Sequence, residues 1–411
     1  MSACGCDSGH SKLRPFAEAL NQLIDSAQTV SGVESIKLED AFGRVLAEDV
    51  TSPISVPPAD NSAMDGYVVN TASLPEDLML PVSQRIAAGE QGEVLQPGTA
   101  ARIFTGSEIP PGADAVIMQE QCQLVGDQVQ LQLRPEQGDH IRPAGQDIQP
   151  GQCVAEKGSL LDGRYLGVLA AVGVAEVSVY RRVKVAILTT GDELQSPGEA
   201  PRPGKIYNSN FYTLKGLLAP LGVDIIYPGI VPDDPDLTTQ AIQAAADEAD
   251  LVISSGGVSV GEEDHVKAAV EALGELMLWR LAIKPGKPLA YGRVGSTPFI
   301  GLPGNPAAVL VTFLMLARPY LLRMQGVQDV IPARYPVKSG FNRHKSVSRE
   351  EFLRAALLQK EGEWVAAPAH SQSSGVLSSA VLSDGLLVIP AETTVAEGDM
   401  LEFIPFHSLL G

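Results

Sequence analysis

The chain has 411 residues, of which 45% are hydrophobic and 19% are charged, and its formal net charge is −19. The length predicts several domains, and the apolar content excludes an intrinsically disordered chain. The acidic balance, with no run rich in Lys and Arg, argues against a free-standing nucleic-acid binder. An anionic substrate would therefore need a bound cation, helix N-termini or a few well-placed basic side chains.

Nothing in the sequence predicts membrane insertion or export. No run reaches the ~20 apolar residues that span a bilayer. The longest one, residues 307–317, follows a Pro-Gly-Asn-Pro turn and predicts a buried helix. Residues 1–10 have neither the basic nor the apolar region of a signal peptide. We therefore expect a cytoplasmic protein with no membrane partner.

The four cysteines form no Cys-x-x-Cys pair, so a structural zinc site is not predicted. Cys4 and Cys6 could grip a metal together with His10, but a mobile terminus with incidental ligands is the favoured interpretation. Cys122 and Cys153 are expected to be small buried apolar residues.

The first part of the chain predicts a linking domain with a β-rich insertion. Apolar residues at helical spacing predict a helix over residues 12–30. Residues 162–173 predict a capped helix that ends at a glycine. Between them, Pro, Gly and Asp punctuate short strand-like runs. These runs are residues 84–88, 101–105, 115–119 and 128–133. The predicted domains are a discontinuous linking domain, residues 11–50 and 147–180, and an inserted β-rich domain, residues 51–146.

The rest of the chain predicts an α/β domain, residues 181–328, and a small β domain, residues 329–411. Near-continuous apolar strands alternate with helices, which indicates a parallel sheet covered on both faces. The expected strands are residues 183–190, 223–231, 251–254 and 298–300, with 385–390 and 400–404 in the last domain. The expected helices are residues 210–218 and 235–249, and one that follows Asp264.

Four loops follow predicted strands of the α/β domain and leave them in the same direction. They are residues 189–194, 232–234, 254–264 and 302–306. Ligands of parallel sheets bind beyond the carboxyl ends of the strands, so we expect these loops to form one site. Glycines would let backbone N–H groups approach a phosphate, and acids would bind Mg²⁺ that bridges to it. The acids are Glu193, Asp233 and Asp264.

Alternative interpretations are open for single members of this set. Asp233 and Asp264 each precede a helix and are about equally expected as N-caps. Lys284 and Lys287 lie next to the loops and could neutralise an oxyanion, although alone they are more often solvated turn residues. The glycine-rich loop fits neither a P-loop nor a Rossmann pattern. The case for a site rests on the convergence of the loops.

Taken together, the motifs resemble the molybdopterin molybdenumtransferases, the MoeA and gephyrin E-domain family. The matching segments are residues 60–67, 105–106, 145–148, 190–194, 255–261, 284–288 and 302–306. The resemblance implies an α/β multidomain protein with a central three-layer α/β domain, a β-rich insertion, a linking domain that dimerises, and a C-terminal β-barrel-like domain. It implies a homodimer with the active cleft between the α/β domain of one subunit and the β-rich domain of the other.

The resemblance also implies a reaction, in which molybdenum from molybdate enters adenylylated molybdopterin and AMP is released with the help of Mg²⁺. Contacts with molybdopterin adenylyltransferase and other molybdenum cofactor synthesis proteins would be in keeping with it. Two alternatives are the preceding adenylylation step and a scaffold that has kept the fold without the chemistry. The large β-rich and C-terminal domains argue against the first, and the intact acids argue against the second.

Residue roles follow from the same resemblance. Glu193, Asp233 and Asp264 would bind Mg²⁺, and Lys284 and Lys287 would attract molybdate. The phosphate would be cradled by Ser254, Ser255, Gly256, Gly257, Ser259 and Gly261. A rigid wall of the cleft would consist of Pro303, Gly304, Asn305 and Pro306. Arg280 stands where some relatives are expected to have a lysine. The partner subunit would supply Asp60, Thr105, Arg142 and Asp147.

Overall fold

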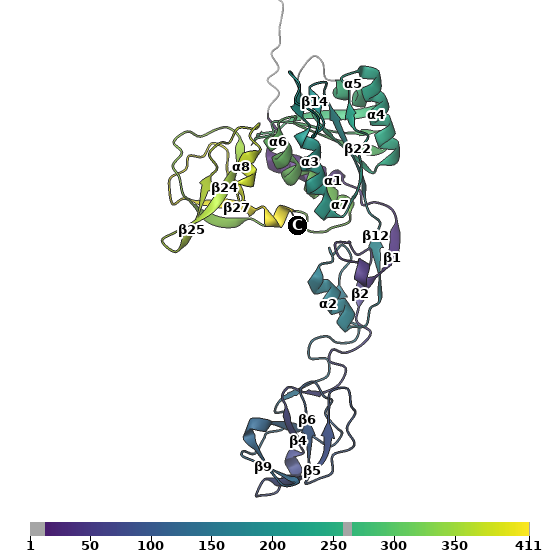
Figure 1. Cartoon of the computed structure of the whole chain (residues 1–411), viewed down its shortest axis with the longest axis vertical. Coiled ribbons are helices and arrows are strands. Elements are labelled where there is room, and N and C mark those ends of the chain that lie inside the picture. The colour runs from purple at the N-terminus through teal and green to yellow at the C-terminus, as the bar shows by residue number, and fades with distance from the viewer. Residues whose placement is uncertain (1–12, 258–264, 411) are drawn as a thin grey trace, which may run out of the picture.

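The computed structural model describes residues 13–257 and 265–410, which form an elongated molecule (Figure 1). The β-rich domain lies at one end, a small linking unit follows, and the α/β domain lies at the other end with a β-barrel beside it. Several residues singled out above lie outside the described ranges. They are Cys4, Cys6, His10, Ser259, Gly261 and Asp264.

The linking unit is built on two short antiparallel strand pairs and one helix. Strand β1 (Val33–Lys37) pairs with β12 (Glu176–Tyr180), and β2 (Val50–Thr51) pairs with β11 (Cys153–Ala155). Helix α2 (Gly163–Ala171) is capped by Asp162, which accepts from two backbone N–H groups of the first turn. Its own small core consists of residues such as Leu46, Leu161, Leu169 and Val177. A pair of extended chain segments connects it to each of its neighbours (Figure 1).

Two expectations for this region were wrong. Chain order predicted that helix α1 (Phe16–Ser26) belongs to the linking domain. In the structure its apolar face packs into the core of the α/β domain, and Phe16 contacts Phe352 of the barrel. Cys153 is exposed rather than buried, because it stands at the start of β11, outside the small core that Ala155 of the same strand joins. Cys122 is half-buried, and burial raises the pKa of its thiol to about 11.

The β-rich domain contains a six-stranded sheet, and each of the four predicted runs overlaps one of its strands. In spatial order the strands are β7 (Ala115–Met118), β4 (Gly66–Val69), β6 (Ala100–Ile103), β5 (Met79–Ile86), β9 (Gln128–Leu131) and β8 (Cys122–Val125). Buried side chains form a cluster on each side of the sheet. A shorter pair, β3 (Asn61–Ser62) with β10 (Ile141–Arg142), brings two distant loops of this domain together.

The α/β domain has the expected parallel sheet, and an antiparallel hairpin extends one edge of it. Its order is β16 (Asp224–Ile226), β13 (Lys184–Thr190), β18 (Leu251–Ser255), β22 (Thr297–Leu302), β21 (Pro288–Val294) and β19 (Gly274–Arg280), and β17 (Ile230–Val231) also pairs with β13. The strands from β16 to β22 are parallel, whereas β21 and β19 form an antiparallel hairpin at the edge. The predicted strand over residues 223–231 is split into β16 and β17 by a Tyr-Pro-Gly segment.

Helices cover both faces of this sheet. Alternate residues of β13 face opposite layers: Val185 and Ile187 join the core with α1 and α3 (Ser209–Leu218). Ala186 and Leu188 join the layer with α4 (Pro235–Glu248) and α5 (His265–Leu273). This is the alternation that the side-chain period of a strand requires.

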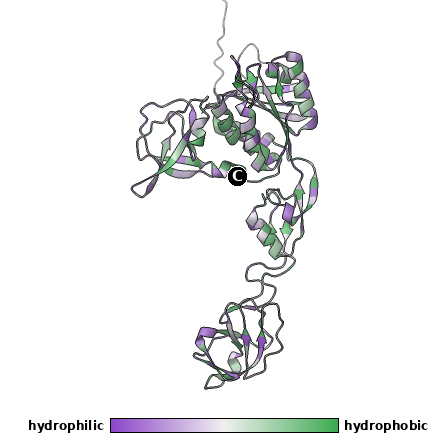
Figure 2. Ribbon diagram, viewed as in Figure 1, coloured by the Kyte–Doolittle hydropathy of each residue, from purple (hydrophilic) through white to green (hydrophobic). Residues whose placement is uncertain are grey.

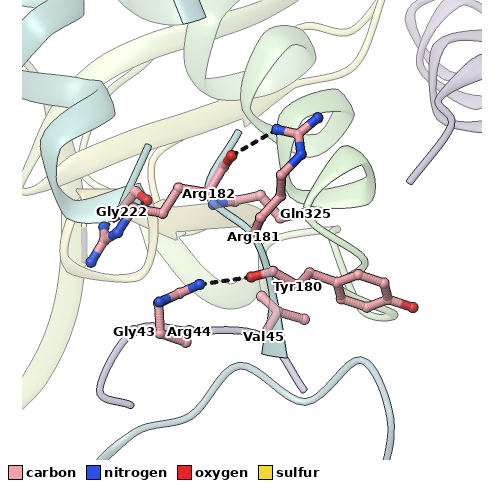
Figure 3. Close-up of a pocket in the computed structure, with 8 residues that line it drawn as sticks. All are labelled: Gly43, Arg44, Val45, Tyr180, Arg181, Arg182, Gly222 and Gln325. Atoms are coloured by element: carbon pink, nitrogen blue, oxygen red, sulfur yellow. Dashed lines mark hydrogen bonds between the residues drawn. The ribbon is translucent and has the colours of Figure 1, made fainter. Parts of the chain in front are cut away.

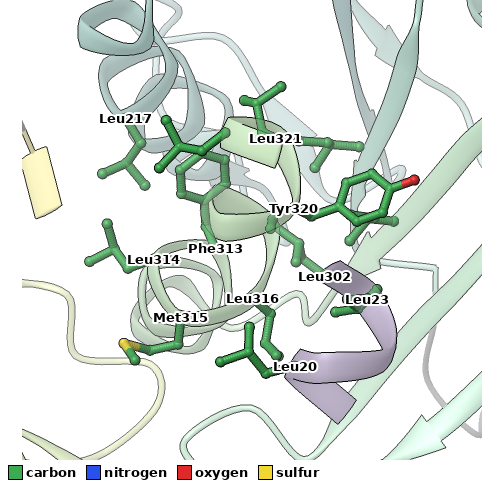
Figure 4. Packing of buried hydrophobic residues seen from close by; sticks show 14 of the residues in the cluster. Leu20, Leu23, Leu217, Leu302, Phe313, Leu314, Met315, Leu316, Tyr320 and Leu321 are labelled. Carbon is green, nitrogen blue, oxygen red and sulfur yellow. The ribbon is translucent and has the colours of Figure 1, made fainter. Parts of the chain in front are cut away.

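The longest apolar run forms the central helix of the core. It consists of α6 (Pro306–Thr312), a π-helical segment (Phe313–Ala317) and α7 (Arg318–Met324). The whole run is long and apolar enough to cross a bilayer, but 89% of it is buried inside the protein. Figure 4 shows Phe313, Leu316 and Tyr320 packed against residues such as Leu20 and Leu302, and Figure 2 shows the concentration of hydrophobic residues here. It is a core helix of the α/β domain.

The C-terminal domain is a closed five-stranded barrel. Strand β24 (Glu350–Lys360) pairs with β25 (Glu363–Pro368), then follow β23 (Tyr335–Ser339), β27 (Met400–Pro405) and β26 (Gly385–Ile389), which returns to β24. A short strand of the α/β domain, β20 (Ile283–Lys284), adds to β24. Minor elements are β14 (Leu194–Gln195), β15 (Ile206–Tyr207), α8 (Ser378–Val381) and α9 (His407–Leu410).

Candidate active site

The four loops predicted to form a site meet at one edge of the sheet, the third of them as far as it is described, through Gly257. Strands β13, β17, β18 and β22 are parallel, so their carboxyl ends lie together. Gly191 donates its N–H to the carbonyl of Val231 at 3.3 Å, and Gly256 donates to the carbonyl of Leu302 at 3.2 Å. The loops are therefore hydrogen-bonded to one another in pairs.

Two acids link the first and second loops. The backbone N–H of Asp192 donates to the Asp233 carboxylate, and the N–H of Asp233 donates to the Asp192 carboxylate, each at 3.1 Å. The cap of α4 is the next residue, Asp234, which accepts from Leu237 at 2.8 Å. Of the two functions open for Asp233, helix capping is thus taken by its neighbour, and the Asp233 carboxylate is at the strand ends instead.

Asn210, a residue that sequence reasoning did not single out, joins the third and fourth loops. Its Nδ2 donates to the hydroxyl of Ser255 and to the carbonyl of Gly304, both at 2.8 Å. The Asn210 Oδ1 and the Ser254 hydroxyl are buried, and neither has a partner in the described part of the chain. Two polar atoms are therefore available to a ligand at this edge.

The glycines of the third loop allow a close approach of backbone segments. Gly256 and Gly257 have φ of +95° and +68°, a region that favours glycine. A Cβ on Gly304 would lie 3.8 Å from the Gly256 Cα. Pro303 is buried and Pro306 begins α6, so the fourth loop is a fixed wall, with Asn305 exposed on it.

Basic residues reach the same edge because of the antiparallel hairpin. Strand β21 runs antiparallel to β22, so the turn before Pro288 lies beside the loop after Leu302. Arg280 is exposed at the end of β19, and Lys287 is half-buried without an acidic partner among the described residues. Lys284 is not free, because its Nζ lies 2.6 Å from Glu351 Oε1.

Glu193, the other proposed metal ligand within the described ranges, lies on the first loop. Its carboxylate folds back over Gly191, where an added Cβ would lie 2.3 Å from a carboxylate oxygen. No group of three His, Cys, Asp or Glu residues that could hold a metal ion occurs within residues 13–257 and 265–410. Glu193 and Asp233 do offer carboxylate oxygens, the donor type that Mg²⁺ prefers.

A second polar cluster lies in the β-rich domain. The carboxylate of Asp60 accepts from the N–H of Ala144 at 2.7 Å, and Asp65 accepts from the N–H and hydroxyl of Thr105 at 2.8 and 2.9 Å. The Thr105 hydrogen bonds hold the pKa of Asp65 below its usual value. Both acids therefore accept from segments distant in the chain, 84 residues away for Asp60 and 40 for Asp65.

The exposed Arg142 and Asp147 belong to the same set of loops. Arg142 lies on β10 opposite Asn61, and Asp147 donates its N–H to the carbonyl of Val56 at 2.9 Å. Within one chain, however, this cluster and the sheet edge lie at opposite ends of the molecule (Figure 1). Within one chain, the residues of the sheet edge lie together and those of the β-rich cluster lie together, but the two groups are far from each other.

Comparisons with known proteins cover nearly all of the chain. Residues 14–173 match the MoeA N-terminal region (domains I and II), residues 186–323 a probable molybdopterin binding domain, and residues 336–406 the MoeA C-terminal region (domain IV). The molybdopterin molybdenumtransferase of Haemophilus influenzae is 39% identical over 96% of this chain and 99% of its own length. That of Bacillus subtilis is 32% identical over 92% and 90%.

The chain belongs to the MoeA family. Solved structures agree: a molybdopterin biosynthesis MoeA protein from Pyrococcus horikoshii OT3 matches 96% of this chain with a TM-score of 0.83 and 29% identity. A second structure from that organism has a TM-score of 0.77 and 33% identity. The resemblance inferred from the seven motifs is thereby confirmed, as is the α/β multidomain fold.

In this MoeA-family chain the barrel also contributes a segment to the sheet edge, which the sequence did not indicate. The carbonyl of Ser374 accepts from the N–H of Ala307 in the first turn of α6 at 2.9 Å. The segment is held by Arg354, a fully buried side chain that donates to the carbonyls of Ser371 and Ser373 at 3.2 and 3.0 Å. Burial lowers the pKa of this guanidinium.

A separate cavity of about 10 Å³ lies between the linking unit and the α/β domain, and it has room for little more than a water molecule (Figure 3). It is lined in part by Arg44, Arg181 and Arg182. All three guanidinium groups already donate, to Glu34, Asp250 and the carbonyl of Gly222 respectively. The cavity lies at the interface between two domains and is not part of the sheet edge.

Proposed function

We propose that this chain transfers molybdenum from molybdate to adenylylated molybdopterin and releases AMP, as a molybdopterin molybdenumtransferase. The observation that carries the proposal is the meeting of acid-bearing, glycine-rich and lysine-bearing loops at one edge of a parallel sheet. Phosphate oxyanions, a hard divalent cation and molybdate all need the groups that gather there.

The third loop would hold the pyrophosphate that joins AMP to molybdopterin. Gly256 and Gly257 form a left-handed turn, and because the Gly256 N–H already donates to the Leu302 carbonyl, the N–H of Gly257 would be the backbone donor to the anion. The hydroxyl of Ser254 is buried, has no hydrogen-bond partner among the described residues, and can donate to an oxyanion. These donors favour the anionic substrate in spite of the net charge of −19.

The oxygen donors at the first two loops fit Mg²⁺. Glu193 and Asp233 would hold the ion, and Asp264 or substrate phosphates would complete its ligands. When bound, Mg²⁺ would neutralise charge on the pyrophosphate. The described side chains otherwise bind and orient: Lys287 and Arg280 attract molybdate, and the 303–306 wall limits where it can lie. Attack on phosphorus needs this positioning and charge neutralisation, and no nucleophilic side chain.

The proposal includes a homodimer in which the β-rich domain of a partner subunit faces this edge. Asp60, Thr105, Arg142 and Asp147 would then complete the cleft. We further propose a cytoplasmic location and contact with the enzyme that supplies adenylylated molybdopterin, because the product of that enzyme is the substrate of this one.

The test is AMP release from adenylylated molybdopterin by the purified chain with Mg²⁺, with and without molybdate. We expect release that requires molybdate and falls at least ~100-fold in Asp233→Asn. Asp234→Asn is the matched control, since Asn caps a helix as well as Asp does, and it should retain activity. Undiminished AMP release by Asp233→Asn would refute the assignment of Asp233 as a metal ligand. Absence of molybdate-dependent release by the unmodified chain would remove the function.

A further inference from the structure

Glu351 is a buried carboxylate of the barrel that reaches the lysine-bearing turn of the α/β domain. Its side chain is 1% exposed. One oxygen lies 2.6 Å from Lys284 Nζ, and the other accepts from Arg343 Nη1. A single carboxylate therefore meets two cations, one from each domain.

Backbone pairing fixes where this contact forms. In the parallel pair of β20 and β24, Lys284 stands directly opposite Glu351, and Ile283 opposite Glu350. Glu350 donates its N–H to the carbonyl of Ala282 at 2.8 Å. The ion pair is thus a cross-strand pair whose register is set by main-chain hydrogen bonds.

The turn is held from the other sides as well. Leu281 donates to the carbonyl of Lys287 at 2.7 Å, which closes the turn. Gly286 has φ of +103°, and a Cβ there would lie 2.2 Å from Thr312 Cγ2 of α6. The backbone of the turn is consequently held between α6 and the barrel.

The two lysines of this turn differ in freedom. A lysine side chain has a flexible four-carbon stem, and fixing it costs conformational entropy when a ligand binds. Lys287 has no acidic partner in the described part of the chain, whereas Lys284 is already fixed by Glu351. Because Arg343 shares the same carboxylate, the trio keeps a net charge of +1 by count, and its ammonium still attracts an anion.

We infer that Glu351 is a positioning residue that fixes the Lys284 ammonium for the incoming oxyanion, so that the barrel takes part in molybdate binding. This inference rests on the proposed function. The opposing interpretation is a purely structural ion pair that joins two domains. The two differ in which kinetic constant changes when the pair is broken.

The experiment measures molybdate-dependent AMP release by the full chain in four forms: unmodified, Glu351→Gln, Lys284→Met and the double variant. We expect each single variant to raise the KM for molybdate about tenfold with kcat nearly unchanged, because the Lys284 ammonium is then absent or no longer held in place before molybdate binds. The double variant should have the KM of Lys284→Met, since Glu351 acts only through Lys284. Glu363→Gln, which removes the exposed partner of Lys338 in the same barrel, should behave as the unmodified chain.

Three outcomes would overturn the inference: an unchanged KM in Glu351→Gln, a lower melting temperature with loss of kcat alone, or a KM in the double variant that is the product of the two single effects. If Glu351→Gln does not fold, Glu351→Met with Arg343→Met replaces the buried charges by apolar groups, and the same KM comparison applies. An unmodified chain without molybdate-dependent release would overturn the proposed function itself, which the variants alone cannot do.

Discussion

Asp250 and Arg181 form a two-pronged ion pair at the start of the central sheet, with both N–O distances 2.7 Å. Asp250 also accepts from the N–H of Lys184 at 2.8 Å, and Arg181 donates to the carbonyl of Ser31 at 3.1 Å. Burial alone would raise the pKa of Asp250, but the hydrogen bonds from Arg181 and Lys184 outweigh it and lower the pKa. The pair thus ties β13 and β18 to the segment after α1.

We expect Asp250→Asn to lower the free energy of unfolding by about 1–2 kcal/mol at pH 7, a modest value because the pair is partly exposed. A carboxylate with a lowered pKa stabilises the fold above its unfolded pKa of ~3.9, and this contribution is lost as pH falls through the folded pKa. Urea unfolding at pH 7 and near pH 3 should therefore show the difference shrinking at the acid end. Asp329→Asn, at an exposed acid without an ion pair among the described residues, is the control. A pH-independent difference would contradict the argument.

At the scale of elements, Gly66 shows that a motif glycine can serve packing. It lies on β4 between β6 and β7, and an added Cβ would lie 1.8 Å from the Ile117 carbonyl oxygen. Backbone of a central strand cannot move aside without breaking the ladder. Its neighbour Asp65 binds Thr105, so β4 both builds the sheet and presents the polar loop.

Gly66→Ala is therefore expected to destabilise the β-rich domain by about 3 kcal/mol or more, as overpacking against backbone does. Gly163→Ala is the matched control, because Gly163 begins α2 with open space around it and alanine favours a helix. Calorimetry should show a lower unfolding temperature in Gly66→Ala and an unlowered one in Gly163→Ala. Equal melting behaviour of the two variants would refute the packing role.

Elements with a regular apolar pattern could be predicted from the sequence, and elements defined by distant partners could not. The continuous run of β13 and the spacing of α4 predict both elements, with ends displaced by a residue or so. The hairpin of β19 and β21 was missed, because it pairs antiparallel at the edge of a sheet whose other strands follow a parallel pattern. It is this hairpin that brings the lysine turn to the site.

The same distinction applies within the candidate site. Loops after strands could be predicted because parallel strands share an edge. Asn210 and Glu351 could not, because their importance lies in partners 45 to 94 and 67 residues away in the chain. Lys284 was expected to be a solvated or oxyanion-binding residue, and its ion pair became visible only once the barrel was placed beside it.

At the scale of the whole molecule, the two polar clusters are at opposite ends of one chain (Figure 1). The linking unit between them has a small core of its own and is joined to its neighbours by pairs of extended segments, so it holds the ends apart rather than folding them together. A site that needs both clusters therefore needs two chains, and a two-fold dimer would supply two such sites.

This arrangement predicts complementation between inactive variants. Asp233→Asn damages the sheet edge and Arg142→Ala damages the β-rich cluster, so each homodimer should have two defective sites. After mixing and subunit exchange, half of the dimers would be mixed, each with one intact site, and activity should return to about a quarter of the unmodified level. Light scattering should show dimers throughout. Failure of mixed dimers to regain activity, or full activity in a monomer, would mean that the two clusters do not share a cleft.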